Sequence, residues 1–413
     1  MLTEIRDILW SLPTVGFITG TGIYFTVKSR FYPIRNAGKI IKSVTASENA
    51  EGISPLKGLM TSLGGTVGVG SITGVALALR QGGAGAIFWM WISSFFCMML
   101  KYAENYITVK GKQKDTALGS ASVLLAGLGK KKTAACFAVF ALLASFGSGN
   151  MAQANAVSEA AISLNLSPLA CGAVFSLLLI PAVAGGQRII ARINGILVPI
   201  AGIFFICVVL GMSLFKLSAL KTAITDIFSS AFGLRQAAAG FSGAAVSAAI
   251  RTGVSKGVFS HEAGMGSSPM AHSAADTTPL LAGNFGVIEV FADTFIVSTV
   301  TALALIMTDK STPEEMFFSF LGNGGGIMLL ISVGIFAYAA VISWCFYSES
   351  CISYLFGNKK MPRIIYRCLC VIFAFLGCVG NVETVWVVSD IFNALMLFPN
   401  MYAVILKRKE LPF

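Results

Sequence analysis

Two glycine-rich stretches interrupt apolar runs that are otherwise long enough to form membrane helices. They read GGTVGVGS at residues 64–71 and FSHEAGMGSSP at residues 259–269. Each glycine costs up to ~1 kcal/mol in a helix interior, and each proline costs about 3 kcal/mol. Both stretches are therefore predicted to break or unwind their helices, which lipid tolerates only where the backbone is buried in protein or lines an aqueous cavity.

The two interruptions match each other, because the Gly-x-Gly-Ser of residues 68–71 returns at residues 264–267. A pair of glycine-interrupted helices in corresponding halves is typical of a midplane site in an inverted-repeat transporter. Backbone N–H groups at a half-helix start attract a carboxylate, and freed carbonyl groups at the opposing end hold an ammonium group or a metal ion. The pattern predicts a site for a zwitterionic amino acid; close helix packing through small residues is the alternative.

The composition places the chain in the membrane class. Of its 413 residues, 55% are hydrophobic and 12% charged, where a soluble domain carries about 25% charged residues. The net charge of +11 lies in the loops and has no basic amphipathic helix beside it, which argues against nucleic-acid binding. The nine cysteines form no CxxC pair, and no nucleophile–base motif appears, so we expect neither a metal centre nor an enzyme, and no cofactor.

Apolar segments of spanning length predict eleven transmembrane helices in one compact domain covering residues 1–413. Their predicted ranges are 9–27, 57–79, 86–109, 133–160, 166–185, 191–215, 236–258, 284–307, 326–347, 364–381 and 383–406.

The Lys and Arg residues are distributed unevenly between the two sides of this arrangement. One set of alternate loops receives 22 of them, with residues 101–132 counted as one loop segment, and the other set receives six. Because basic loops stay in the cytoplasm, we predict a multi-pass protein of the bacterial or archaeal cell (inner) membrane. Its N-terminus is then outside and its C-terminus cytoplasmic.

Five blocks of the sequence resemble signature segments of the alanine or glycine:cation symporter family (sodium:alanine symporters) of the amino acid-polyamine-cation superfamily. They are residues 65–104 with their FWMW and KYAE motifs, GNMAQANAV (149–157), GVFSHEAGMGSSPMAHSAA (257–275), EVFADTFIVST (289–299) and DIFNALMLFPN (390–400). The resemblance implies an all-α fold of the leucine-transporter type, with five-plus-five inverted repeats at 57–215 and 236–406. The helix at 9–27 is then an extra one.

The resemblance also implies symport of a small neutral amino acid, alanine or glycine, with a cation by alternating access. Gln153 is the candidate hydrogen-bond partner of the substrate carboxylate, with a helix–helix hydrogen bond as its alternative. Trp344 is a candidate lid over the substrate, with a place in an interfacial aromatic belt as its alternative. The other implied substrate-binding residues are Thr66, Gly68, Gly70, Ser71, Phe259, Ser260 and Gly264.

The coupling ion is left open by three departures from the family pattern. Ser71 and His261 stand where asparagine is usual, and Ala339 and Ala340 replace residues that include the usual hydroxyls. In this fold sodium is held between backbone carbonyls, here those of Gly64 and Val67, and two hydroxyls of the 326–347 helix, so the alanines put sodium in doubt.

A proton is the alternative coupling ion. His261 and Glu262 would then form a titratable pair inside the membrane, or His261 is a neutral hydrogen-bond donor in place of asparagine. The tentative cation-binding set is Gly64, Val67, Ser71, His261 and Glu262. An uncoupled amino acid facilitator is the alternative function. We expect the buried acids Glu104, Glu289, Asp293 and Asp390 to cap helices or pair with Lys or Arg, with no role in transport.

Overall fold

The protein is helical throughout the part that the computed structural model describes, which comprises residues 1–45, 52–111, 120–233, 242–357 and 359–413. The first half contains α1 (Leu2–Leu9), α2 (Leu12–Lys28), α3 (Tyr32–Arg35), α4 (Ala37–Ser43), α5 (Pro55–Thr66), η1 (Val69–Ser71), α6 (Thr73–Gly82), α7 (Gly85–Lys110), α8 (Ala121–Gly127), α9 (Lys131–Phe146), η2 (Gly147–Met151), α10 (Ala152–Ile162) and α11 (Pro168–Leu214).

The second half repeats this pattern of long and interrupted helices. It contains η3 (Leu217–Ala219), α12 (Leu220–Ala231), α13 (Ser242–His261), α14 (Ser268–Ala274), α15 (Pro279–Val290), η5 (Phe291–Ser298), α16 (Thr299–Thr308), α17 (Pro313–Leu321), α18 (Asn323–Phe356), α19 (Lys360–Val379), α20 (Val382–Leu406) and η6 (Arg408–Glu410).

The predicted eleven spans are present with changes at their ends. Among the described residues, eight helical segments are long and apolar enough to cross a membrane. One of them, α11, has 47 residues and a non-helical Gly186 in its interior. At 1.5 Å per residue it is about 70 Å long, against a hydrocarbon core of about 30 Å. It therefore holds two of the predicted spans, and the interrupted pairs α5–α6 and α13–α14 supply the other two.

Several predicted boundaries were wrong. The helix predicted at 9–27 begins only at Leu12, because Ser11 is extended and separates α1 from α2, and Pro13 lies in the first turn of α2. The connection predicted between 185 and 191 is only a kink at Gly186, with φ 72°. The helix α18 continues nine residues beyond the predicted end at 347. Residues 236–241 of the helix predicted at 236–258 lie outside the described residues, and that helix continues to His261.

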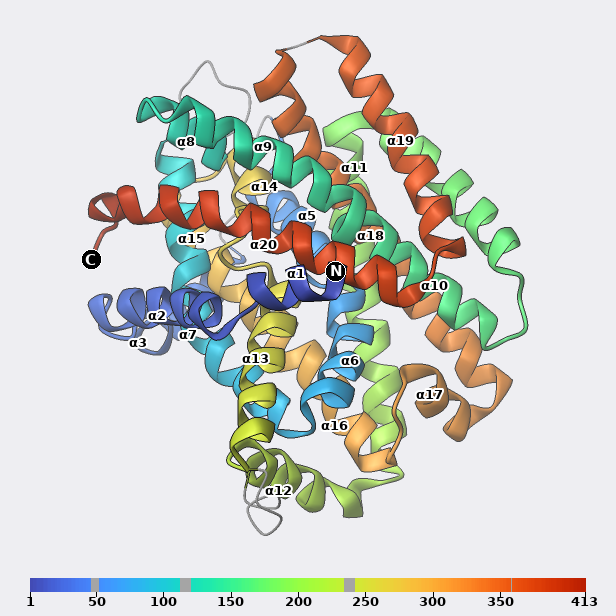
Figure 1. The fold of residues 1–413 in the computed structure, drawn as a ribbon. Coiled ribbons are helices and arrows are strands. Elements are labelled where there is room, and N and C mark those ends of the chain that lie inside the picture. Colours follow the sequence, from blue (N-terminus) through green and yellow to red (C-terminus); the bar gives the residue numbers. More distant parts are fainter. Residues whose placement is uncertain (46–51, 112–119, 234–241, 358) are drawn as a thin grey trace.

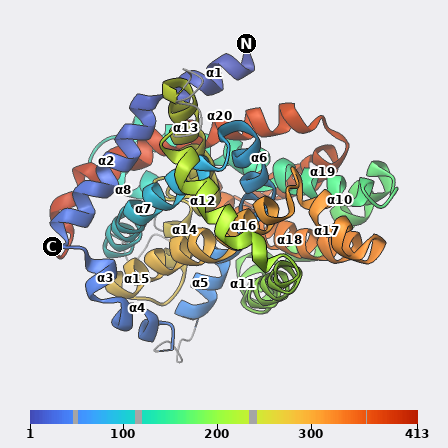
Figure 2. The same ribbon diagram turned by 90° about the horizontal axis from the view of Figure 1, so that it is seen from below.

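The two interrupted helices lie side by side in the middle of the bundle (Figure 1). The half-helix α5 packs against α14, and α6 packs against α13. Around them, α7 contacts both α13 and α15, while α18 contacts α5, α10 and α11. The short α12 lies across one end of the bundle against α7 and α16 (Figure 2).

The outward faces of the bundle are apolar. Leu177 and Ile203 on α11 and Ile372 on α19 are each more than half exposed. Large exposed aliphatic side chains of this kind are expected where a helix faces lipid. The N-terminal α1 packs against α20, near the interrupted helices (Figure 1).

Candidate functional site

Both predicted interruptions are confirmed, and each has a local cause. The first helix ends at Thr66, and Val67 and Gly68 leave the helical conformation before a short 3₁₀ turn and the start of α6 at Thr73. The second helix ends where Glu262 adopts a left-handed φ of 55°, followed by Gly264 at 87° and Gly266 at 78°. Only glycine takes such angles without strain, so these two glycines permit the opening.

The second interruption begins later than its sequence pattern indicates. Phe259, Ser260 and His261 lie in the last turn of α13, not in the opened segment. The Glu262 amide still donates a helical hydrogen bond to the Val258 carbonyl at 2.8 Å. The opened backbone therefore comprises residues 262–267, and the side chains of residues 259–261 project from a helix end.

The first interruption touches the end of α13, next to the second interruption, at Gly70 and Ser260. A Cβ placed on Gly70 would lie 3.2 Å from the Ser260 Cα and 3.2 Å from the Phe259 ring. The hydroxyl oxygens of Ser71 and Ser260 are 3.2 Å apart. Four of the predicted substrate-binding residues are thus brought together from the two halves of the chain.

Gln153 on α10 contacts the first interruption. Its Oε1 accepts a hydrogen bond from the Val69 amide at 3.1 Å, and its Nε2 donates to the Ser148 carbonyl at 3.0 Å. A Cβ on Gly68 would lie 2.9 Å from the same Oε1 and 3.4 Å from Ala340. Gln153 therefore connects α10 to the first interruption by a hydrogen bond, which is the alternative role predicted for it. Its predicted contact with a substrate carboxylate stays a prediction.

Trp344 closes over the second interruption from α18. Its indole Nε1 donates to Glu262 Oε1 at 2.9 Å, and Glu262 Oε2 accepts from the Ser267 hydroxyl at 2.5 Å. The ring is 2% exposed and packs on Tyr347. Membership of an interfacial aromatic belt is wrong for Trp344, because its ring lies in the protein core.

The fit between Trp344 and Gly149 gives a first prediction. A Cβ on Gly149 would lie 2.3 Å from the indole, so Gly149→Ala displaces the ring and its bond to Glu262. We expect the rate of substrate uptake to fall at least about tenfold, the equivalent of one lost hydrogen bond to a charged group. Initial uptake rates in proteoliposomes measure it. Gly202→Ala on α11 is the control, since its Cβ meets nothing within 4 Å; equal rates for both variants would contradict the fit.

The surroundings of Gly64 differ from those predicted. Ala339 and Ala340 are fully buried and offer no hydroxyl, but Ser343, one turn further along α18, lies at this place. A Cβ on Gly64 would be 2.7 Å from the Ser343 hydroxyl and 3.1 Å from the Asn194 amide nitrogen. That nitrogen donates to the Ser343 hydroxyl at 2.7 Å. Ser343 follows Ala339 by four residues, about one helical turn, so the sequence alone could have indicated a hydroxyl on this face of α18. The sodium site predicted at Gly64 and Val67 stays a prediction.

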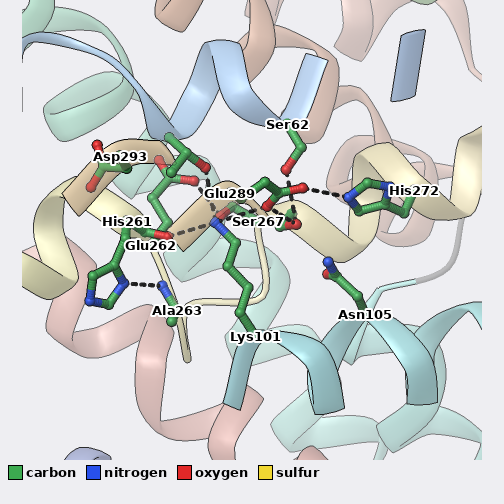
Figure 3. Close-up of polar contacts among 12 residues, drawn as sticks. Ser62, Lys101, Asn105, His261, Glu262, Ala263, Ser267, His272, Glu289 and Asp293 are labelled. Carbon is green, nitrogen blue, oxygen red and sulfur yellow. Dashed lines mark hydrogen bonds and ion pairs between the residues drawn. The ribbon is translucent and has the colours of Figure 1, made fainter. Parts of the chain in front are cut away.

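Lys101 does not lie in a cytoplasmic loop, although its place in the segment 101–132 predicts one. It lies inside α7 and is fully buried. Its ammonium group is 3.0 Å from Glu289 Oε2, and it donates to the Thr66 hydroxyl at 2.9 Å and to the His261 carbonyl at 2.6 Å. Figure 3 shows Lys101 at the centre of the cluster. One cation therefore joins the ends of α5 and α13, where helix dipoles are negative.

The predicted pairing of the buried acids is confirmed in two cases. Glu289 pairs with Lys101 and is also 2.6 Å from His272 Nε2. Asp390 pairs with Lys256 at 2.8 Å. Glu104 instead accepts hydrogen bonds from the Gly264 and Gly266 amides and from the Asn400 side chain. The Gly264 amide, predicted to bind substrate, is thus engaged by Glu104.

The side chains of His261 and Glu262 form no hydrogen bond with each other in the described structure. The Ala263 amide donates to His261 Nδ1 at 3.1 Å (Figure 3). The Glu262 carboxylate accepts instead from the Ser267 hydroxyl and the Trp344 indole. Because a backbone amide can only donate, His261 Nδ1 is an acceptor, so His261 does not donate there in place of asparagine. The structure does not bring the two residues together as a proton-sharing pair.

Next to Phe259, an ion pair and two tryptophan side chains connect α13, α20 and the N-terminal segment. The Phe259 ring packs on Trp386 with centroids 5.1 Å apart, and the Lys256 ammonium lies over both rings. The same ammonium pairs with Asp390, whose carbonyl accepts from the Trp10 indole at 2.9 Å. Trp10 and α20 thus cover the side of Phe259 that faces away from Gly70.

The helix order and the paired interruptions define a fold of the leucine-transporter type. The solved structure of MhsT in complex with L-phenylalanine superposes with a TM-score of 0.59 over 86% of this chain and 98% of that one, at 16% identity. The sequence profile of the sodium:alanine symporter family matches residues 1–411. The chain belongs to this family, which is one of transporters.

Two curated relatives are similar over nearly the whole length. The sodium/alanine symporter AgcS of Methanococcus maripaludis is 36% identical over 98% of this chain and 94% of its own. The probable sodium/glutamine symporter GlnT of Bacillus subtilis is 32% identical over 98% of this chain and 87% of its own. With its apolar helices, the protein is a multi-pass membrane protein.

Proposed function

We propose that the protein imports a small neutral amino acid, alanine or glycine, together with sodium by alternating access. The observation that carries this proposal is the contact at Gly70 and Ser260 between the first interruption and the end of α13, which leads into the second interruption. Opened backbone in the middle of a membrane bundle offers N–H groups and carbonyls to a dipolar ion. The names of the relatives AgcS and GlnT support sodium as the coupling ion.

A small substrate side chain is supported by the neighbours of this place. Gly68 faces Gln153 and Ala340, Gly70 faces Phe259, and Gly149 lies against Trp344. Even a methyl group added at these glycines would contact a neighbouring side chain. Tight surroundings of this kind favour alanine or glycine over a branched or aromatic amino acid.

The domain organisation and orientation belong to the same proposal. Residues 1–413 form one transport domain, with repeats at 57–215 and 236–406 rocking against each other around a fixed site. The N-terminus lies outside a bacterial or archaeal cell membrane and the C-terminus inside. Without Lys101, which is buried, 21 basic residues still lie on the side assigned to the cytoplasm and six on the other. A C-terminal reporter that is active only in the cytoplasm should be active; an inactive one would reverse the orientation.

Uptake into proteoliposomes tests the function. With an inward sodium gradient, labelled L-alanine should accumulate inside above its external concentration, and a sodium ionophore should abolish the accumulation. Excess glycine should compete, and phenylalanine should compete much less. Equilibration without accumulation would show an uncoupled facilitator, and accumulation driven only by a proton gradient would contradict sodium coupling.

A further inference from the structure

An apolar groove lies on the outward face of the bundle, between the short helix α4 and the membrane helices α7 and α15. Its volume is about 460 Å³, and every described side chain that lines it is apolar. It reaches from Ile41 on α4, which is 68% exposed, to Phe95 in the middle of α7 and Phe295 in η5. Figure 2 shows α4 beside α15 at the rim of the bundle. A bound water needs polar partners, so a lipid acyl chain suits this groove better than water does.

The wall that α4 forms is held firmly against the bundle. Arg30 and Phe31 both have left-handed φ angles, of 54° and 57°, and this turn separates α2 from α3. The Tyr32 hydroxyl then donates to Asn284 Oδ1 on α15 at 3.0 Å, and its ring packs on Tyr102 of α7 with centroids 5.3 Å apart. Ile40 on α4 is 3% exposed. The groove is therefore a built feature of the fold.

The segment that forms this wall is strongly basic. Residues 28–45 contain five basic residues and no acidic one. Lys39 and Lys42 lie three residues apart on α4, hence on one side of it, and they are neighbours in the chain of the groove-lining Ile40 and Ile41. Both lysines are exposed, and no acidic side chain pairs with either of them within the described ranges. Two ammonium groups are thus available to an anion at the end of the groove.

An apolar groove beside exposed basic residues matches a molecule with an acyl chain and an anionic head group. Basic residues next to a membrane helix attract anionic lipids of the cytoplasmic leaflet. In the proposed orientation α3 and α4 lie on the cytoplasmic side, where this leaflet is. A neutral lipid could fill the groove, but it would leave the charge of the basic segment without a partner.

We infer that the groove binds one anionic phospholipid, with an acyl chain against Phe95 and Phe295 and the head group at Lys39 and Lys42. This site lies outside the place where the interruptions meet and goes beyond the proposed function. The groove also borders η5 through the Phe291 and Phe295 rings, which stack with centroids 5.7 Å apart.

The same π-helical element reaches the interruptions. Asp293 in η5 accepts hydrogen bonds from the Ser71 hydroxyl and from the Ser260 hydroxyl, the latter at 2.9 Å. A lipid in the groove therefore supports the element that contacts η1 and the end of α13.

Native mass spectrometry of the delipidated full-length protein, titrated with dioleoyl-phosphatidylglycerol or dioleoyl-phosphatidylcholine, tests the site. Wild type should bind one phosphatidylglycerol at least about tenfold more tightly than phosphatidylcholine. Lys39→Gln combined with Lys42→Gln should remove this difference. Ala37→Phe should weaken the binding of both lipids, because Ala37 is exposed and its new ring would fill the groove. The control is Lys131→Gln with Lys132→Gln, which removes the same charge at the exposed start of α9 and should bind like wild type.

Each other outcome contradicts the site. Equal affinity of wild type for the two lipids would show contact with acyl chains alone. An equal loss in the two lysine pairs would show attraction by net charge, without a site on α4. Displacement of the lipid by millimolar inorganic phosphate would show a site for free phosphate. If Ala37→Phe does not fold, the variant of Lys39 and Lys42 decides, and unchanged preference in it overturns the site. None of these measurements involves transport, so the proposed function can fail while the lipid site stands.

Discussion

Replacing Lys101 with methionine should abolish alanine uptake and lower the melting temperature of the protein by about 5 °C. The substitution leaves the Glu289 carboxylate buried without its 3.0 Å ammonium partner. Removing one member of a buried ion pair typically costs about 3–5 kcal/mol. It also removes the donor that the Thr66 hydroxyl and the His261 carbonyl share, so the ends of α5 and α13 lose their common anchor. Thermal unfolding in detergent and uptake in proteoliposomes measure the two effects.

Two further variants separate charge from structure. Lys101→Met combined with Glu289→Gln should melt at a higher temperature than Lys101→Met alone, because residue 289 then carries no charge that lacks its partner. Lys407→Met removes an i,i+3 pair with Glu410 that is about 30% exposed, and such pairs contribute at most about 1 kcal/mol. If Lys101→Met and Lys407→Met behave alike in both measurements, Lys101 does not anchor the two interruptions.

Glu104→Ala should reduce uptake at least about a hundredfold. The Glu104 carboxylate accepts from the Gly264 amide at 3.1 Å, the Gly266 amide at 3.2 Å and the Asn400 amide at 2.7 Å. Each buried donor left without an acceptor costs about 1–3 kcal/mol. With three such donors, the opened segment 262–267 loses the contacts that fix its left-handed glycines.

Hydrogen exchange is the more specific readout for this substitution. The amides of Gly264 and Gly266 should exchange much faster in Glu104→Ala, and less so in Glu104→Gln, which keeps one acceptor oxygen. Glu383→Ala at the exposed start of α20 is the matched control. Unchanged exchange of residues 262–267 in Glu104→Ala would show that this carboxylate does not hold the second interruption.

The sequence was sufficient to predict the interruptions because their causes are local. The glycines of GGTVGVGS and EAGMGS disfavour a helix wherever they occur, and the structure opens both stretches. The number of spans also follows from local hydropathy, since each needs about 20 apolar residues. The family blocks fixed the order of the helices, and the structure confirms the leucine-transporter fold.

The charged network was not predicted, because it depends on contacts between distant parts of the chain. Lys101 meets Glu289, and Ser71 meets Asp293, only when the helices pack. Lys101 and Glu104 nevertheless carried a usable signal, since both lie inside the span predicted at 86–109. An ionisable residue within a membrane helix is a functional candidate by default, and this rule should have outweighed the count of basic loop residues.

The π-helical turns were also beyond local reasoning. Gly147–Met151 places Gly149 against Trp344, and Phe291–Ser298 carries Asp293. Such turns are short insertions within longer helices and frequently occur at functional sites. No residue type in GSGNM or FADTFIVS distinguishes them from an ordinary helical segment, so the positions of Gly149 and Asp293 emerge only from the three-dimensional structure.

We propose that the two interrupted helices together bind a small amino acid where Gly70 meets Ser260. An experimental structure of the protein in lipid nanodiscs with L-alanine and sodium tests this most directly. We expect density for the amino acid between residues 66–71 and the end of α13, beside Trp344. Alanine bound elsewhere in the bundle, or residues 64–71 and 259–269 seen as continuous helices, would contradict the account.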